Sequence, residues 1–102
     1  MKIELGDWGQ FIRKVKYDEK RVVPIIMRNL EKYERLGDAL LSLEDLLKND
    51  PETDESEFVS EIDGRKFRVI RTEPKFEAPG ITLLYYVAGF HIMVWGIRLT
   101  DD

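Results

Sequence analysis

The chain has 102 residues, of which 43% are hydrophobic and 35% are charged, and it contains no cysteine. This length is typical of one domain, and the lack of cysteine excludes disulfide bonds, thiolate metal sites and a cysteine nucleophile. We find no signal-like start and no apolar run of about 18 residues, so we expect a cytoplasmic protein without a membrane span. The formal net charge of −4 argues against a nucleic-acid binder that is basic overall.

The charges are unevenly distributed along the chain. Between residues 49 and 64 every charged side chain is acidic, whereas residues 65–75 contain five cations and a single acid, Glu73. Two interpretations stay open. In the first, the acidic loop and the basic strand screen each other's charge. In the second, the cations form a local stripe that binds an anion.

The first 17 residues form an N-terminal arm whose secondary structure is ambiguous. Lys2–Leu5 alternates and fits a short strand or an extended arm. In the segment Asp7–Tyr17, four apolar residues have the i, i+3, i+4, i+7 spacing of a helix, which slightly favours that structure: Trp8, Phe11, Ile12 and Val15. Alternation of apolar and basic residues in the same segment keeps a first strand open as the alternative.

Residues 18–48 carry the pattern of two amphipathic helices, which predicts a helical hairpin. Proline is tolerated only in the first turn of a helix, so Pro24 predicts that the first helix begins at about Val23. We expect Gly37 to end this helix and Asp38 to cap the second, which would cover Ala39–Lys48.

Asp63-Gly64 lies between two alternating runs and predicts a two-residue hairpin turn, because both turn positions require positive φ. The expected cross-strand pairs are Ile62 with Arg65, Glu61 with Lys66, Ser60 with Phe67 and Phe58 with Val69. One face of this hairpin would then collect its large apolar side chains: Phe58, Ile62, Phe67 and Val69.

A second hairpin is expected after the Pro- and Gly-containing loop of residues 73–80, with Ala88-Gly89 as its turn. One face would hold Ile81, Leu83, Tyr85, Val87, Phe90, Ile92 and Val94, and the other would hold Leu84, Tyr86, His91, Met93 and Trp95. Because both faces are largely apolar, these strands need cover on both sides. The helical hairpin supplies one cover, and either residues 7–17 or a partner supplies the other. The expected fold is α+β, with an N-terminal helical hairpin packed on a four-stranded antiparallel meander over residues 57–99.

Few residues are candidates for chemistry. The one histidine, His91, would lie opposite Tyr86, as a hydrogen-bonded residue of the sheet or as an acid–base group. Metal-ligand spacings, glycine-rich phosphate loops and serine-nucleophile motifs are missing, so we expect neither a metal nor a cofactor. The remaining candidates are cations that could clamp a phosphate, or equally be solvated and paired with the acidic loop: Arg65, Lys66, Arg68, Arg71, Lys75 and Arg98.

The order of these elements resembles the RelE/ParE superfamily of toxin–antitoxin toxins, over residues 18–98. Leu47-Lys48-Asn49-Asp50-Pro51 is similar to the Asn-Pro segment that ends a helix in the family. Phe67-Arg68-Val69-Ile70-Arg71 and Leu83-Leu84-Tyr85-Tyr86-Val87 resemble two of its strands, and Gly96-Ile97-Arg98 resembles its Gly-His-Arg ending. Under this resemblance, residues 11–17 would be the first strand.

The resemblance implies a toxin that acts on RNA or the translation machinery and is neutralised by an antitoxin. Arg68, Arg71 and Arg98 match positions that orient the scissile phosphate in the nucleases of the family, with Arg65, Lys66 and Lys75 as further nucleic-acid contacts. Ile97 stands where the family ending has histidine, so RNA cleavage and RNA binding both stay open. The alternative is a non-catalytic interaction domain whose apolar sheet face binds a partner helix or a second copy of the chain.

Overall fold

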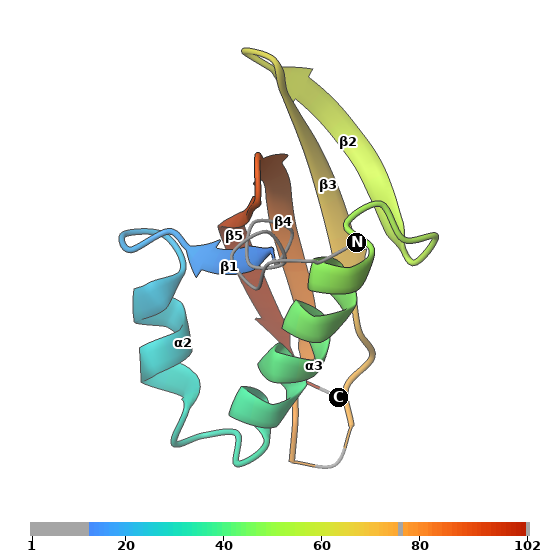
Figure 1. Ribbon diagram of the computed structural model, residues 1–102. Helices are drawn as coiled ribbons and strands as arrows, with labels where there is room; N and C mark the ends of the chain where they lie inside the picture. Colours follow the sequence, from blue (N-terminus) through green and yellow to red (C-terminus); the bar gives the residue numbers. More distant parts are fainter. Residues whose placement is uncertain (1–12, 76, 102) are drawn as a thin grey trace, which may run out of the picture.

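The computed structural model describes residues 13–75 and 77–101, and within them two helices lie on a five-stranded sheet (Figure 1). In chain order the elements are β1 (Lys14–Tyr17), α2 (Val23–Asn29), α3 (Leu36–Asn49), β2 (Ser56–Ile62), β3 (Arg65–Arg71), β4 (Gly80–Ala88) and β5 (His91–Thr100). The strand or arm expected at Lys2–Leu5 and the first half of the expected helix over 7–17 lie outside the described residues.

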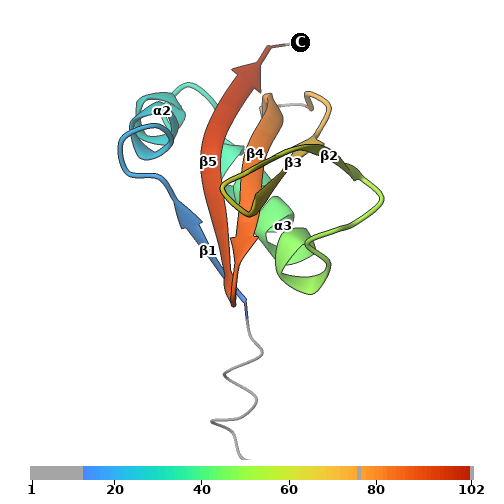
Figure 2. The ribbon, with the colours of Figure 1, turned by 90° about the horizontal axis from the view of Figure 1, so that it is seen from above.

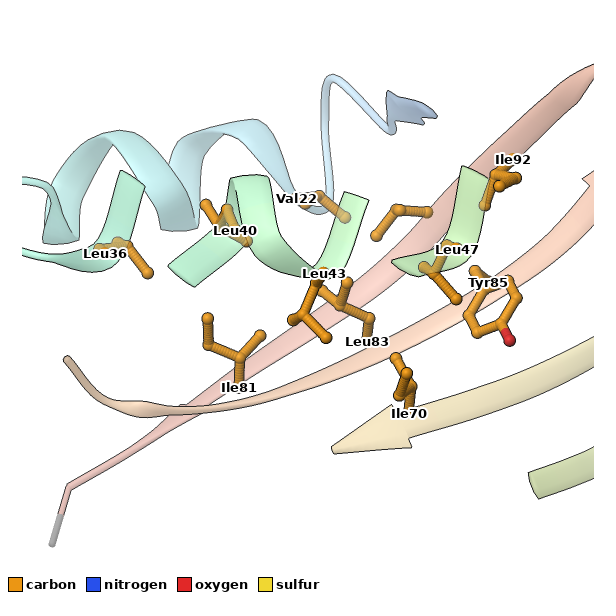
Figure 3. Close-up of a cluster of buried hydrophobic side chains, with 11 residues drawn as sticks. Val22, Leu36, Leu40, Leu43, Leu47, Ile70, Ile81, Leu83, Tyr85 and Ile92 are labelled. Carbon is orange, nitrogen blue, oxygen red and sulfur yellow. The ribbon is translucent and has the colours of Figure 1, made fainter. Parts of the chain in front are cut away.

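The hydrophobic core lies between α3 and one face of the sheet. Leucines at a spacing of three to four residues place one stripe of α3 against the strands, as a helix of 3.6 residues per turn requires: Leu36, Leu40, Leu43 and Leu47. Figure 3 shows these side chains above Ile81, Leu83 and Tyr85 of β4. The Tyr85 hydroxyl donates a hydrogen bond to the Pro51 carbonyl, which ties the loop after α3 to the sheet.

The strand order is β1-β5-β4-β3-β2, and it corrects the expected four-stranded antiparallel meander. The four strands β2 to β5 do pair antiparallel in sequence order, but β1 adds a fifth strand that runs parallel to β5. The sheet is therefore mixed. The α+β class is confirmed.

Strand β1 also decides between the two alternatives for the N-terminal arm, as far as the described residues reach. Val15 and Tyr17 pack against the core, whereas Lys14 and Lys16 are exposed, which is the period of two that a strand produces. The helical interpretation of this part is wrong. Because β1 extends the edge of the sheet, residues 14–17 do not cover the face opposite the helices, and no other described element does.

In the β2–β3 hairpin the predicted turn is confirmed, since Asp63 and Gly64 both have positive φ. The three pairs next to the turn also form as expected. A bulge at Val59 then shifts the register, so Phe58 lies opposite Arg68 and not opposite Val69. The bulge also moves Phe58 off the expected apolar face, whereas Ile62 still shares the face of Phe67 and Val69. Both Phe58 and Ile62 are exposed.

The turn between β4 and β5 is Gly89-Phe90, one residue later than expected, and Gly89 has the positive φ. The pairing is consequently shifted by two residues, and Tyr86 lies opposite Met93 while His91 lies opposite Ala88. A shift of two keeps every side chain on its face. The predicted inner face is therefore largely buried, with its two turn-proximal members exposed, Val87 and Phe90.

The first helix begins at Val23 with Pro24 in its first turn, as predicted. It ends at Asn29, however, and Gly37 does not terminate it. Gly37 and Asp38 lie in the first turn of α3, which begins at Leu36. Leu36 is fully buried, and its burial brings the residues before the glycine into the second helix.

We expect Leu47→Ala to lower the free energy of unfolding by about 2 to 5 kcal/mol, because it leaves a cavity in the core between α3 and the sheet. Leu47 is 0% exposed, whereas Leu41 on the same helix is 58% exposed. Leu41→Ala is therefore the matched control and should change stability by less than about 0.5 kcal/mol. Urea denaturation measures both. Equal losses in the two variants would contradict this assignment of the core.

Candidate functional site: the open face of the sheet

The sheet face that points away from α3 can be read from the strand register, because residues paired across strands share a face. Arg71, Thr82 and Arg98 form one row across β3, β4 and β5. Farther along the strands, Lys14 and Lys16 of β1 lie beside His91 and Met93. We call this surface the open face. Along each strand, its residues alternate with the residues that point toward α3.

The open face is strongly basic although the chain is acidic overall. Its cations are Lys14, Lys16, Arg65, Arg71 and Arg98 from the strands, with Arg21 reaching it from the β1–α2 turn. Among the strand residues that the structure describes, only Glu57 places a carboxylate on this face, opposite Val69. A surface with this excess of positive charge attracts polyanions, even when the protein as a whole has a negative net charge.

Three aromatic rings lie at the centre of the open face. The Phe67 ring centroid is 5.1 Å from that of Tyr86 and 6.4 Å from that of Trp95, in tilted and edge-to-face arrangements that aromatic pairs prefer. Trp95 is the extra residue at a bulge between β4 and β5, where Leu84 pairs with Gly96 and Tyr85 with Val94. Figure 2 shows the strong twist between the β2–β3 hairpin and these two strands.

Two arginines cover these rings. The Arg21 guanidinium lies 3.9 Å from the centroid of the Trp95 ring, and that of Arg65 lies 5.0 Å from the Tyr86 ring. Both distances are within the range of a cation–π interaction. The Asp18 carboxylate fixes the turn that carries Arg21, because it accepts hydrogen bonds from the backbone N–H groups of Lys20 and Arg21. The bond from the Arg21 N–H is the main reason why the pKa of Asp18 is lowered.

The structure separates the three arginines that the family resemblance placed together. Arg71 and Arg98 lie in one row of the open face, but Arg68 points to the opposite side, where it pairs with Tyr85. There its Nε donates to Ser56 Oγ at 2.9 Å and its Nη2 donates to the Ser56 carbonyl at 3.2 Å. Arg68 is thus committed to holding β2 against β3. The alternation of side chains along β3 could have revealed this, since residues 68 and 71 differ by an odd number.

The other candidate cations are dispersed. Lys66 is exposed opposite Glu61, close to the hairpin turn. Lys75 lies in the β3–β4 connection and, with Arg71, lines a cavity of about 450 Å³ beside α3. Besides Arg71, the charged residues that line this cavity are two cations and three carboxylates, so it has no preference for an anion: Arg35, Lys75, Asp38, Glu55 and Glu73.

A second, apolar groove of about 390 Å³ lies between α2 and α3 on the other side of the molecule. It is lined largely by aliphatic side chains, namely Val23, Ile26, Leu30, Leu40 and Leu41, together with Tyr17, Gly37 and Glu44. The Tyr17 hydroxyl donates a hydrogen bond to Glu44 at 2.7 Å. Burial, followed by the interaction with Glu44, raises the pKa of Tyr17 well above its usual range, so this hydroxyl stays protonated.

The sequence did not single out Arg21, Lys14, Lys16 or Trp95 as site residues. Lys14 and Lys16 could have been found from their alternation with Val15 and Tyr17, once a strand was accepted there. No local signal identifies Arg21, because its ring partner lies 74 positions later in the chain, as the numbering of the two residues shows.

Within residues 13–75 and 77–101, no three histidine or carboxylate side chains lie close enough together to bind a metal ion. Neither helix in that part of the chain is long and apolar enough to cross a bilayer. The chemistry of the open face is therefore carried by its cations, hydroxyls and aromatic rings.

We expect Arg68→Met to lower the free energy of unfolding by about 1 to 3 kcal/mol, because it removes two charge-assisted hydrogen bonds to the buried Ser56. Arg71→Met, three residues later on the same strand, should change stability by less than about 0.5 kcal/mol. Urea denaturation of both variants tests the assignment. A stable Arg68→Met protein would show that the Arg68–Ser56 contact does not hold the β2–β3 hairpin.

Comparison of the chain with protein families, with characterised proteins and with solved structures finds no match. The function must therefore be argued from the geometry of this chain.

Proposed function

We propose that the protein binds single-stranded RNA on the open face of its sheet, with Arg71 and Arg98 as phosphate contacts. The observation that carries this proposal is the charge of the face, on which the strands place five cations and one carboxylate in a chain of net charge −4. Arg21 adds a sixth cation from the β1–α2 turn, where it is paired with Asp18 at 3.5 Å. Arginine suits phosphate because its planar fork donates two parallel hydrogen bonds.

The aromatic cluster between the cations favours a nucleic acid over a simple polyanion. From the Arg71–Thr82–Arg98 row to the Lys14–His91–Ala88 row, the face extends over six residues of β4, or about 20 Å. A track of positive charge along aromatic side chains is typical of surfaces that bind single strands. The Thr82 hydroxyl lies between Arg71 and Arg98, where it can hydrogen-bond a ribose 2′-hydroxyl.

The resemblance to RelE/ParE toxins supplies the biological role in this proposal, a toxin-type domain directed at the RNA of the translation machinery. The placement of Arg68 changes the roles expected for the three arginines. Arg71 and Arg98 remain available to a phosphate, while Arg68 supports the hairpin. His91 lies at the far end of the open face, six β4 positions from the arginine row, and does not reach a phosphate held there. Binding is therefore better supported by the geometry than cleavage.

We expect Arg71→Ala with Arg98→Ala to weaken the binding of a labelled single-stranded RNA about tenfold or more at physiological ionic strength. Each lost phosphate contact should also lower the salt dependence, the slope of log K against log salt, by about 0.7, so the double variant should lose about 1.4. Fluorescence anisotropy over a salt series measures both quantities.

The matched control is Arg28→Ala with Arg35→Ala, which removes the same charge from the helical side. If both double variants lose affinity equally, the effect is one of net charge and the open face is not the site. In cells, induced expression of the wild-type chain should slow growth and the open-face double variant should not. Harmless expression of both would reject the toxin role, although not RNA binding itself.

A second candidate function is recognition of a partner protein, and the apolar groove between α2 and α3 favours it. Met27, Leu30 and Leu41 are exposed beside this groove, so an amphipathic helix of an antitoxin-type partner could add a third helix there. The sequence pattern predicted such a partner on the apolar sheet face, but the helices offer the more apolar surface.

We expect co-expression with a small adjacent reading frame to yield a complex that Leu41→Glu disrupts and the Arg71→Ala, Arg98→Ala variant retains. Co-purification followed by size-exclusion chromatography measures this. A complex that survives Leu41→Glu but is lost with the open-face variant would place the partner on the sheet instead.

A further inference from the structure

Arg21 and Arg65 differ from ordinary surface arginines because an aromatic ring supports each guanidinium group. They come from the β1–α2 turn and from the first residue of β3, yet both lie over rings of one aromatic cluster. The Arg21 side chain is 54% exposed, and the residue Arg65 is also exposed. Both guanidinium groups are thus supported from below and open to solvent above.

Two of the three rings of the cluster are nearly inaccessible, and Trp95 is partly exposed. Phe67 and Tyr86 are each 7% exposed, so a nucleobase cannot lie on them directly. Their role is to hold: Phe67 packs on both Tyr86 and Trp95, which in turn support Arg65 and Arg21. The surface that an RNA meets at the centre of the open face therefore consists mainly of guanidinium groups, with the partly exposed Trp95 beside them.

A guanidinium plane can stack on an unpaired base, and proteins that bind single-stranded RNA use arginine in this way beside aromatic rings. An arginine that is already restrained by a ring and by the Asp18-stabilised turn loses less side-chain freedom when a base stacks on it. Base faces inside a duplex are covered by their neighbours, so such a platform selects unpaired bases.

We propose that Arg21 and Arg65, supported by Trp95 and Tyr86, are base-stacking residues for single-stranded RNA, while Arg71 and Arg98 hold its phosphates. This inference rests on the proposed function and assigns a separate task to each pair. Asp18 and Trp95 are positioning residues for Arg21. Charge alone does not account for the stacking pair, whereas it accounts for most of the phosphate pair.

The test uses substitutions that keep the charge and remove the plane. Arg21→Lys with Arg65→Lys should weaken binding of a single-stranded RNA of about 16 nucleotides roughly tenfold, with an unchanged salt slope, because stacking is lost and charge is retained. Duplex RNA should bind equally to this variant and to the wild type. Denaturation midpoints within a few degrees would show that both proteins are folded.

A second readout needs no change at the site. The chain has two tryptophans, and Trp8→Phe leaves Trp95 as the only one. Addition of the same RNA to this variant should change the Trp95 fluorescence, and addition of duplex RNA should not. The response should disappear when Arg21→Lys and Arg65→Lys are added to Trp8→Phe.

The outcomes separate this inference from the function on which it rests. If the wild type binds single-stranded RNA and the lysine variant binds it equally well, with the same Trp95 response, the stacking role is wrong and RNA binding stands. If the wild type binds neither RNA, the proposed function is wrong and the inference falls with it. Equal affinity for single-stranded DNA would leave the stacking role intact and reject the contact between Thr82 and the ribose.

Discussion

The packing of α3 on β4 is the contact on which the rest of the structure depends. Four leucines of the helix close the inner face of the sheet, and Tyr85 of β4 is fully buried beneath them while its hydroxyl binds the loop that follows α3. One helix of this length covers one face of a narrow sheet. With α2 also contributing its neighbouring Val22 to the same core, the described helices leave the other face open.

That asymmetry separates the charges of the molecule. Carboxylates are concentrated in the loop before β2, at Asp50, Glu52, Asp54 and Glu55, whereas the open face carries the cations of β1, β3 and β5. A net charge is therefore a poor description of this protein. Over distances of about 8 to 10 Å in physiological salt, a ligand responds to the local field and not to the sum.

The aromatic cluster resolves a difficulty that an open face creates. Large apolar side chains exposed to water on a sheet invite non-specific association. Here Phe67 and Tyr86 are buried against each other and beneath Arg65, and Trp95 lies beneath Arg21. The two arginines thus give the face a hydrated surface and hold the rings beneath them in place. Of the large apolar side chains that remain exposed, Ile62 lies opposite Arg65 at the edge of the open face. The others belong to the helical side, to the rest of the edge strand and to the β4–β5 turn: Met27, Leu30, Leu41, Phe58, Val59, Val87 and Phe90.

Local signals in the sequence determined a large part of the fold. The Asp63-Gly64 turn and the start of α2 at Val23 depend on the backbone preferences of a few adjacent residues, and both were predictable. The inner face of β4 and β5 was also predictable, even though the turn between them was displaced, because a shift of two residues preserves the alternation.

Only the tertiary structure decided the features that join distant segments. The parallel pairing of β1 with β5 and the place of Arg21 over Trp95 each depend on contacts that no short window contains. The candidate site was accordingly predicted in part: Arg71 and Arg98 share the open face, Arg68 does not, and the ring-supported arginine from the β1–α2 turn was missed. A residue type and its spacing specify which side chain can act. Which side chains meet depends on how the strands pair, and that is set by the burial of the whole core.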